Sequence, residues 1–253
     1  MTATAPPLRG EEPTSPGVRR PGSGETRPDR SRVWVVVPAY NEAPRLGQSL
    51  NALCSRWPNV VVVDDGSTDG TTETARAHAV WLVRHPLNLG QGAALLTGIR
   101  FALRRSADFI ITFDADGQHD VEDLDALMEP LVRGDADIAF GSRFLGSAVG
   151  MPRGRRLLLA AAVLLTRALY GIPVTDAHNG LRAMTRRTAA SLRMTTNRME
   201  HASEILESVR EQRLRWTEVP VTIRYTEDSL SKGQQTTAAI PLFVRLLLEK
   251  LIR

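Results

Sequence analysis

The chain has 253 residues, 42% of them hydrophobic and 24% charged, which suits one domain of the larger α/β kind or at most two small ones and excludes wholesale disorder. The single cysteine excludes an internal disulfide framework and a cysteine-based metal cluster. The net charge of +4 is small and aromatic residues make up only 5%, so we expect no nucleic-acid partner.

The first half of the chain is predicted to alternate strands with helices. Residues 1–30 are rich in Pro, Gly, Ser, Thr and Arg, and we expect them to form a disordered tail. Short apolar runs predict strands at 33–37, 59–63, 80–83, 109–113 and 137–140, and Pro38 is expected to end the first. Helical spacing predicts helices around Leu46, Leu50 and Leu53 and at 71–78, 90–105 and 121–132. This alternation favours a doubly wound, mostly parallel sheet.

The second half of the chain is less regular. Helices are predicted at 156–170 and 200–213, and an alternating strand is predicted at 216–225, which Pro220 restricts to a sheet edge. We expect a single folded domain at 31–236, followed by an amphipathic C-terminal helix at 237–253. The longest uninterrupted apolar run, at 157–165, has nine residues, whereas a membrane-spanning helix needs about 20. No spanning helix is therefore expected.

Two acidic residues follow the predicted fourth strand. Asp114 and Asp116 are two positions apart at a strand end, so their side chains can point the same way. Adjacent carboxylates repel each other unless a cation lies between them, and oxygen ligands favour Mg²⁺ or Mn²⁺ shared with substrate phosphates. Gln118 could add a carbonyl oxygen to such a site, and His119 is a weaker candidate. The alternative is an acidic turn that caps the next helix.

A second acidic pair, Asp64 and Asp65, follows the predicted second strand. A carboxylate at this edge of an α/β sheet could hydrogen-bond a nucleobase or the hydroxyls of a ribose. The alternative is a turn in which Ser67 or Asp69 caps the following helix. The sequence contains neither the glycine fingerprint of NAD-binding folds after its first strand nor a P-loop motif. These two classes of nucleotide site are therefore not expected.

Charge is unevenly distributed along the chain. Residues 64–125 contain eleven acidic and five basic side chains, a balance of −6. Residues 151–198 contain nine arginines and one acidic residue, a balance of +8. An acidic segment suits a cation and a basic segment suits anions, unless both are simply solvated faces.

Five motifs occur in order, each at a predicted strand end: VVVPAYNE at 35–42, VVVDDGSTDGT at 61–71, NLGQG at 88–92, DADGQH at 114–119 and GSRF at 141–144. Over residues 32–230 the chain thereby resembles the inverting glycosyltransferase family 2, whose GT-A fold has a Rossmann-like, mostly parallel sheet flanked by helices. Within the family it looks most like polyprenyl-phosphate glycosyltransferases of the dolichol-phosphate mannose synthase type. The motifs DADGQH and GSR, the helix start at 155–157 and TDAHNGLR at 175–182 point to that type.

The resemblance implies a role for individual residues. The nucleotide-sugar donor would be bound by residues of the strand-end motifs and of the segment after the last strand: Pro38, Tyr40, Glu42, Asp65, Asp114, Arg224 and Lys232. The Mg²⁺ or Mn²⁺ ion would be bound by oxygen donors after the fourth strand: Asp114, Asp116 and Gln118. The acceptor phosphate would be bound by arginines: Arg143, with Arg155 or Arg156. The residues implied to carry the catalysis are Asp114, Asp116 and Arg143.

The expected chemistry agrees with these roles. Loss of a nucleoside diphosphate builds negative charge, which a metal ion and Lys or Arg side chains stabilise. A lipid phosphate is already ionised near neutral pH and needs positioning by cations, a task that suits Arg, although these arginines could instead cover an amphipathic helix. A hydroxyl acceptor would need a carboxylate base. Glu204 or Glu200 could be that base, or could simply favour the N-terminus of their helix.

We therefore predict a glycosyltransferase that moves a sugar, with inversion, from a nucleotide-diphosphate sugar to a polyprenyl phosphate at the membrane surface. The alternatives are a family 2 enzyme acting on a hydroxyl of a soluble or glycan acceptor, and a non-catalytic nucleotide-sugar-binding domain. A lipid acceptor requires access to the bilayer, so we expect a cytoplasmic protein that is peripheral at the cytoplasmic membrane face or works with a membrane partner protein. The apolar faces at 157–165 and 237–253 would supply the contact, unless they pack on the domain.

Overall fold

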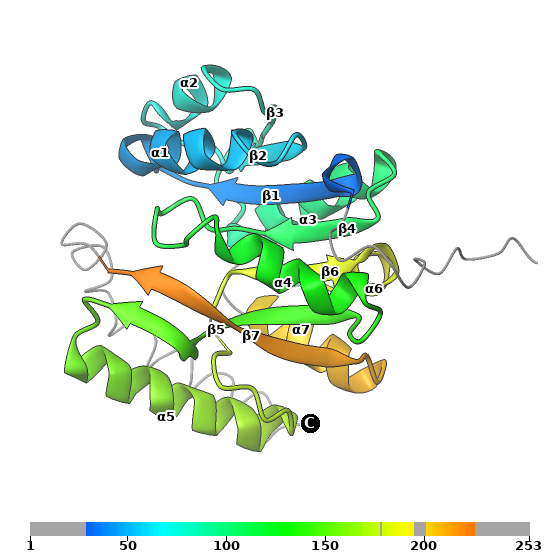
Figure 1. The fold of residues 1–253 in the computed structure, drawn as a ribbon. Helices are drawn as coiled ribbons and strands as arrows, with labels where there is room; N and C mark the ends of the chain where they lie inside the picture. Colours follow the sequence, from blue (N-terminus) through cyan, green and yellow to red (C-terminus); the bar gives the residue numbers. More distant parts are fainter. Residues whose placement is uncertain (1–28, 178, 195–200, 226–253) are drawn as a thin grey trace, which may run out of the picture.

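The computed structural model of the chain describes residues 29–177, 179–194 and 201–225 (Figure 1). Most of the tail predicted at 1–30 and all of the helix predicted at 237–253 lie outside these residues. The described part opens with a short 3₁₀ helix, Arg30–Arg32, that leads into the first strand. Arg30 donates two hydrogen bonds to the Asp125 carboxylate, at 2.8 and 2.7 Å, and thereby fixes the entry of the chain into the domain.

A seven-stranded sheet runs through the domain in the order β3-β2-β1-β4-β6-β5-β7. Its strands are β1 (Val33–Ala39), β2 (Val60–Asp64), β3 (Trp81–Arg84), β4 (Phe109–Thr112), β5 (Ile138–Val149), β6 (Arg182–Thr185) and β7 (Trp216–Arg224). Strands β1 to β4 are parallel, β6 is antiparallel to both of its neighbours, and β5 pairs in parallel with β7. The predicted single α/β domain with a mostly parallel sheet is confirmed.

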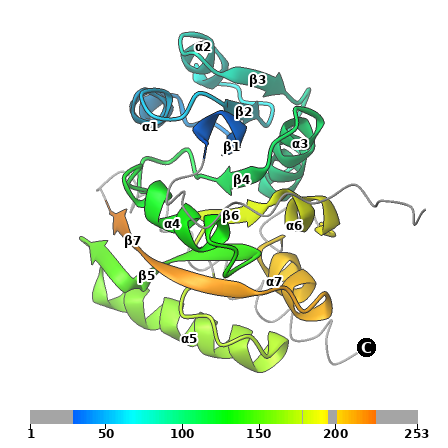
Figure 2. The same cartoon turned by 45° about the vertical axis from the view of Figure 1, so that its right-hand side comes forward.

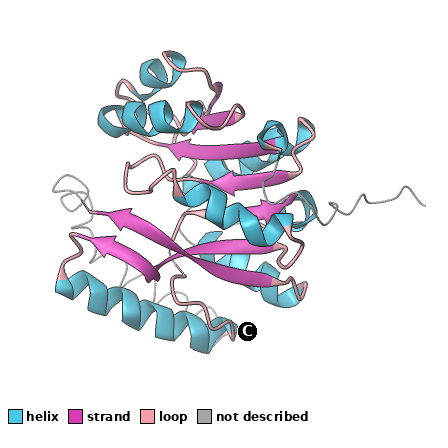
Figure 3. Cartoon of the chain, viewed as in Figure 1, coloured by secondary structure: helices cyan, strands magenta, loops and turns pink. Residues whose placement is uncertain are grey.

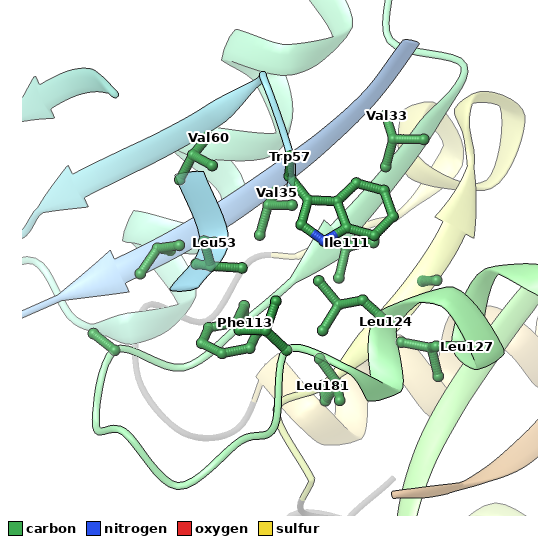
Figure 4. Close-up of a cluster of buried hydrophobic side chains, with 14 of the residues drawn as sticks. Val33, Val35, Leu53, Trp57, Val60, Ile111, Phe113, Leu124, Leu127 and Leu181 are labelled. Carbon is green, nitrogen blue, oxygen red and sulfur yellow. The ribbon is translucent and has the colours of Figure 1, made fainter. Parts of the chain in front are cut away.

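Helices cover both faces of this sheet (Figures 2 and 3). They are α1 (Ala43–Cys54), α2 (Thr71–Arg76), α3 (Gln91–Arg104), α4 (Asp123–Val132), α5 (Arg153–Tyr170), α6 (Arg186–Ser191) and α7 (His201–Glu211). On one face Leu53 of α1 and Leu124 of α4 pack with Trp57 (Figure 4). On the other face Leu95 of α3 and Ile205 of α7 form a second core cluster. None of the described helices is long and apolar enough to cross a membrane.

Strand β1 continues beyond Pro38, where it was predicted to end. Both polar groups of a residue in a parallel strand point to the same neighbour. Val36 faces β4, since its carbonyl accepts from Phe113 N–H at 3.0 Å, and the pairing with β4 ends at Val36. Pro38 faces the same side beyond that last pair, so its missing N–H costs no ladder bond. On the β2 side the ladder goes on, because Ala39 accepts from Asp65 N–H at 2.9 Å. The predicted strand end was therefore wrong.

The second half differs from the prediction in two elements. Strand β5 runs to Val149 instead of stopping at residue 140, because its pairing with β7 resumes after an irregularity between Ser142 and Ser147. Strand β6 and helix α6 were not predicted, and β6 begins with a buried arginine, Arg182, in place of an apolar run. Strand β7 lies at the predicted sheet edge, with Pro220 opposite Ser142, so that prediction is confirmed.

Candidate active site

The donor-side motifs gather at the carboxyl edge of the parallel strands. Strands β2, β1 and β4 lie side by side and end at the same edge, which is where open α/β sheets bind ligands. Hydrogen bonds join the loops that follow them. Asn41 Oδ1 accepts from Thr68 N–H at 2.9 Å, which links the β1 and β2 loops. Gln91 Nε2 at the start of α3 donates to Asp114 Oδ1 at 3.1 Å, after β4.

Asp114 is surrounded by groups that favour its charged form. Its Oδ2 lies 3.2 Å from His119 Nε2, and Arg182 is close enough to act on it electrostatically. Burial alone would raise the pKa of Asp114, but the His119 hydrogen bond and the nearby positive charges outweigh it and hold the pKa below its usual range. A Cβ atom at Gly180 would lie 1.9 Å from Asp114 Oδ2, so this close approach requires glycine.

Asp116 is in the opposite electrostatic position. Its Oδ1 accepts from Gln118 N–H at 3.0 Å. Burial raises the pKa of Asp116, and the negative charge of Asp114 raises it further. The positive charge near Asp116 is therefore too small to offset these two effects, whereas at Asp114 the positive charges outweigh burial.

This donor set fits a hard divalent cation. Asp114 and Asp116 present carboxylate oxygens that repel each other, which is the arrangement that Mg²⁺ or Mn²⁺ relieves. Within the described residues no three His, Cys, Asp or Glu side chains are grouped so that they could hold a metal ion. A cation here would therefore take its remaining ligands from substrate phosphates and water, as Mg²⁺ commonly does.

Asp65 lies inside the donor-side loops. Its Oδ1 accepts from Leu89 N–H at 3.0 Å and lies 2.7 Å from His85 Nδ1, and its Oδ2 accepts from Gly90 N–H at 2.7 Å. Asp65 thus ties the end of β2 to the loop before α3, and it is buried. Gly66 permits this packing, because it has a φ of +74° and a Cβ there would lie 2.5 Å from the Leu87 backbone. The role of Asp65 in binding the base or the ribose of a nucleotide stays a prediction.

The predicted nucleotide-pocket residues of the first motif differ in exposure. Pro38 is buried within β1. Tyr40 follows the strand with 44% of its surface exposed, so its ring is open to a ligand. Glu42 is ion-paired with Arg45 at 3.0 Å, and its backbone N–H donates to Thr71 Oγ1 at 2.9 Å. Of the three, Tyr40 is the side chain that a nucleotide can reach most directly.

Arg143 lies in β5 and is buried. Its Nε donates to Asp176 Oδ2 at 2.6 Å, its backbone N–H donates to the same oxygen at 3.1 Å, and its Nη1 donates to the Tyr225 hydroxyl at 2.5 Å. Burial alone would lower the pKa of Arg143, but Asp176 and Tyr225 outweigh it and raise the pKa above its usual value. Arg143 is thus a fixed cation, with its Nε directed at Asp176 and one Nη1 donor directed at Tyr225.

Arg155 and Arg156 are both on the first turns of α5 but face differently. The Arg155 guanidinium lies over the ring of Tyr225, 5.0 Å from its centroid. Arg156 is exposed. The structure therefore places Arg155 against Tyr225, which also contacts Arg143. Which of Arg155 and Arg156 binds an acceptor phosphate stays a prediction.

Gln118 and Arg224 meet through their backbones. Gln118 O accepts from Arg224 N–H at 2.9 Å, while the Arg224 side chain binds Asp120 at 2.9 Å. A cavity of about 270 Å³ beside this contact is lined by Gly117 and Arg224 among others, but not by the carboxylates of the predicted metal site. The predicted roles of Gln118 as a metal ligand and of Arg224 as a phosphate ligand therefore stay predictions.

Three further candidates are placed as follows. Lys232 and Glu200 lie outside the described residues. Glu204 lies in the first turn of α7 and is half-buried. Its role as a base stays a prediction.

Three residues with prominent contacts received no role from the sequence. Asp176 is the carboxylate that holds Arg143, and Tyr225 contacts both Arg143 and Arg155. Arg182 is buried in β6, and its Nε and Nη1 make no hydrogen bond within the described structure. Burial lowers the pKa of Arg182, against the charges of Asp114 and Asp176. Both Asp176 and Arg182 belong to the TDAHNGLR motif, which was the available signal.

Comparison with known proteins agrees with this geometry. The model of the family described as glycosyl transferase family 2 matches residues 34–192, more than half of the chain. The chain belongs to glycosyl transferase family 2. The resemblance predicted from the motifs is confirmed, and with it the class of enzyme, a glycosyltransferase.

Named relatives and solved structures are similar over most of the chain. The UDP-N-acetylglucosamine–dolichyl-phosphate N-acetylglucosaminyltransferase of Methanococcus voltae is 30% identical over 241 residues, covering 87% of this chain and 96% of the relative. The polyprenol monophosphomannose synthase of Mycolicibacterium smegmatis is 36% identical over 185 residues, covering 68% and 69%. Glucosyl-3-phosphoglycerate synthase from Mycobacterium tuberculosis, solved with Mn²⁺, UDP and glucosyl-3-phosphoglycerate, has a TM-score of 0.66 at 22% identity, covering 86% and 79%. It shares the fold.

Proposed function

We propose that this chain is an inverting, metal-dependent glycosyltransferase that moves a sugar from a nucleotide-diphosphate sugar to a polyprenyl phosphate. The observation that carries the proposal is the short segment that joins a carboxylate site to an arginine site. Asp176 holds Arg143, and Gly180, four residues later, packs against Asp114. A donor diphosphate at the carboxylates and an acceptor phosphate at the arginine would therefore be held close to each other.

The donor side suits a nucleotide sugar with a divalent cation. Asp114 and Asp116 would hold Mg²⁺ or Mn²⁺, and that cation, when bound, offsets the charge that develops on the leaving diphosphate. Tyr40 would lie against the nucleotide, and the Asp65-braced loop would border it. The solved M. tuberculosis structures, with Mn²⁺ or Mg²⁺ and UDP, support this assignment.

The acceptor side suits an ionised phosphate. Arg143 and Arg155 both contact Tyr225, so their guanidinium groups converge on the same aromatic side chain. A phosphate ester is ionised near neutral pH, so it attacks without a general base once cations have positioned it. The dolichyl-phosphate and polyprenol acceptors in the names of the two sequence relatives support a lipid phosphate.

The outer face of α5 supports contact with a membrane surface. Leu157 is 75% exposed and Leu164 is 65% exposed, and residues seven positions apart share a helix face. Arg153 and Arg156 are exposed on the first turns of the same helix. Apolar side chains beside arginines are typical of helices that lie in the headgroup region. We place this face against the cytoplasmic leaflet, with or without a membrane partner protein.

The test offers radiolabelled UDP-glucose, GDP-mannose and UDP-N-acetylglucosamine separately, each with or without polyprenyl phosphate and Mn²⁺. We expect one donor to transfer its label into an acid-labile product that extracts into organic solvent, and EDTA to abolish the transfer. Turnover with a soluble hydroxyl acceptor but not with polyprenyl phosphate would reject the lipid acceptor. Donor binding without transfer to any acceptor would instead favour a non-catalytic domain.

A further inference from the structure

Tyr225 lies between the two arginines assigned to the acceptor phosphate. Its hydroxyl accepts a hydrogen bond from Arg143 Nη1 at 2.5 Å. Its ring lies under the Arg155 guanidinium, 5.0 Å from centroid to Cζ, which is within the range of a cation–π contact. Arg143 comes from β5 and Arg155 from α5, so Tyr225 is the side chain on which two separate elements converge.

The backbone of Tyr225 is fixed independently of the arginines. Tyr225 N–H donates to Val149 O at 2.9 Å, which continues the pairing of β5 with β7 past the end of β7. Gly150 has a φ of +75°, and a Cβ there would lie 2.8 Å from Tyr225 O, so the turn after β5 closes tightly over this residue. The ring therefore points at the arginines from a rigid base, and it is buried.

A second brace holds Arg143 from the other side. Asp176 accepts from Arg143 Nε, and the turn that carries Asp176 is itself held by Glu218 of β7. Glu218 Oε1 accepts from Thr175 N–H at 2.8 Å and from Asp176 N–H at 3.1 Å. With Nε bound to Asp176 and one N–H of Nη1 bound to Tyr225, Nη2 and the second N–H of Nη1 are the Arg143 donors left for an anion.

The two arginines differ in how their positive charge is compensated. Asp176 balances the charge of Arg143 at 2.6 Å. No carboxylate among the described residues pairs with Arg155, which instead lies against the aromatic ring of Tyr225. Arg155 therefore supplies the net positive charge of the pair, while Arg143 supplies directed donors.

We propose that Tyr225 is a positioning residue that assembles the acceptor-phosphate subsite, orienting Arg143 through its hydroxyl and Arg155 through its ring. The proposal rests on the proposed function, because it takes the anion at the two arginines to be the acceptor phosphate. Tyr225 itself does not contact the reacting atoms in this assignment. It fixes the spacing of two cations that come from different elements.

The experiment uses the full chain with Tyr225→Phe, which keeps the ring, and Tyr225→Leu, which removes it. Binding of farnesyl phosphate is measured by calorimetry, and steady-state kinetics are measured with polyprenyl phosphate and the accepted donor. We expect Tyr225→Phe to raise the farnesyl phosphate Kd and the acceptor KM about tenfold, and Tyr225→Leu to raise them about threefold more. The KM for the donor and the Kd for UDP with Mn²⁺ should not change.

The matched control is Ser147→Ala. Ser147 Oγ donates to Thr222 Oγ1 at 3.2 Å, so this variant removes a hydrogen bond between β5 and β7 without touching either arginine, and it should behave as wild type. Equal acceptor constants for wild type and both Tyr225 variants would overturn the inference. Suppose that the wild type binds farnesyl phosphate and Tyr225→Phe binds it more weakly, but that the wild type transfers no sugar to polyprenyl phosphate. That result would refute the proposed function and still support Tyr225 as the residue that positions a phosphate subsite. A wild type that binds no farnesyl phosphate would refute both.

Discussion

The carboxylate site after β4 and the arginine site of β5 and α5 both bury charge, but they compensate it differently. At the carboxylate site the half-buried Asp116 lies next to the negative charge of Asp114, and the pKa of Asp116 is raised. At the arginine site Arg143 is held by Asp176 and Tyr225, and the pKa of Arg143 is raised, which for a cation means that the charged form is favoured. The first site needs a cation from outside, whereas the second is completed by the protein itself.

This difference has a consequence for stability. Removing the charge of Asp116 should relieve repulsion, whereas removing the charge of Arg143 should leave a buried partner uncompensated. Neutral substitutions of Asp116 and of Arg143 should therefore change stability with opposite signs when no metal ion or substrate is present.

Asp116→Asn is expected to have the largest effect on activity. Loss of a carboxylate from the proposed metal site should lower kcat about 10³-fold, because a bound divalent cation contributes several kcal/mol of charge stabilisation. Mn²⁺ with UDP should raise the Tm of the wild type but not of the variant. The matched control is Asp108→Asn, at the opposite end of β4, where the side chain makes an exposed ion pair with Arg32. Metal-dependent transfer by Asp116→Asn at the wild-type rate would exclude Asp116 from the metal site.

Asp116→Asn also tests, in the absence of metal, whether the charge of Asp116 lowers the stability of the fold. The pKa of Asp116 is raised in the folded state, so its ionised form costs stability. That cost is absent below the unfolded-state pKa of Asp, about 3.9, and grows as the pH rises through the folded-state pKa. In EDTA at pH 7, Asp116→Asn should unfold at a urea concentration equal to or above that of the wild type, and its advantage should shrink as the pH falls. A variant that is less stable at pH 7 would contradict the proposed repulsion.

Arg143→Met should change stability in the opposite direction, by lowering the free energy of unfolding. It leaves the buried Asp176 carboxylate without its closest cation, and breaking a buried pair from one side costs about 3–5 kcal/mol. Adding Asp176→Asn should restore most of the stability, since a neutral amide needs no counter-charge. Urea unfolding of the two single variants and the double variant measures this coupling. Arg215→Met, which breaks an exposed pair with Asp137, should cost much less. Simple additivity in the Arg143–Asp176 cycle would show that the pair is not a unit.

Gly180→Ala tests the segment that joins the two sites. The added methyl would lie 1.9 Å from Asp114 Oδ2, so the carboxylate or the backbone must shift. Misplacement of about 1 Å at a reacting centre can cost about 10²-fold in rate, and we expect a loss of that order in kcat/KM. The control is Gly47→Ala in α1, where the new methyl meets Thr74 Cγ2 at an ordinary 3.5 Å and alanine favours the helix. Wild-type kcat/KM in Gly180→Ala would show that this contact does not position Asp114.

The carboxylate site was predictable from the sequence because it is local. Asp114 and Asp116 stand just after an apolar run, and the topology of parallel strands alone places them at the ligand-binding edge. The partners of Arg143 are not local, since Asp176 is 33 residues away and Tyr225 is 82 residues away. Their contacts depend on the register of β5 with β7 and on the turn at Asp176 that Glu218 of β7 holds, which no short motif encodes.

The same distinction between local and non-local contacts explains which elements of the fold were predicted wrongly. The parallel strands β1 to β4 are short apolar runs and were found, although the C-terminal end of β1 depended on its neighbours. Strand β6 was missed because it carries the buried Arg182, whose presence there is understandable only beside Asp114 and Asp176. Sequence patterns therefore predicted the strands that are apolar runs, and missed β6, whose burial depends on charges from other elements, together with the short helix α6 that follows it.

The smallest effect is expected where the arginine site would meet the bilayer. Leu157→Ser combined with Leu164→Ser removes two exposed apolar side chains from α5 without opening the core. We expect partitioning onto vesicles of anionic phospholipid to fall about tenfold, with an unchanged Tm. The control is Leu87→Ser, an exposed leucine after β3, at the opposite end of the sheet from α5 (Figure 1). Equal partitioning of all three proteins would show that the α5 face does not contact the membrane. A Tm lowered in the α5 variant but not in the control would show that this face packs against the protein.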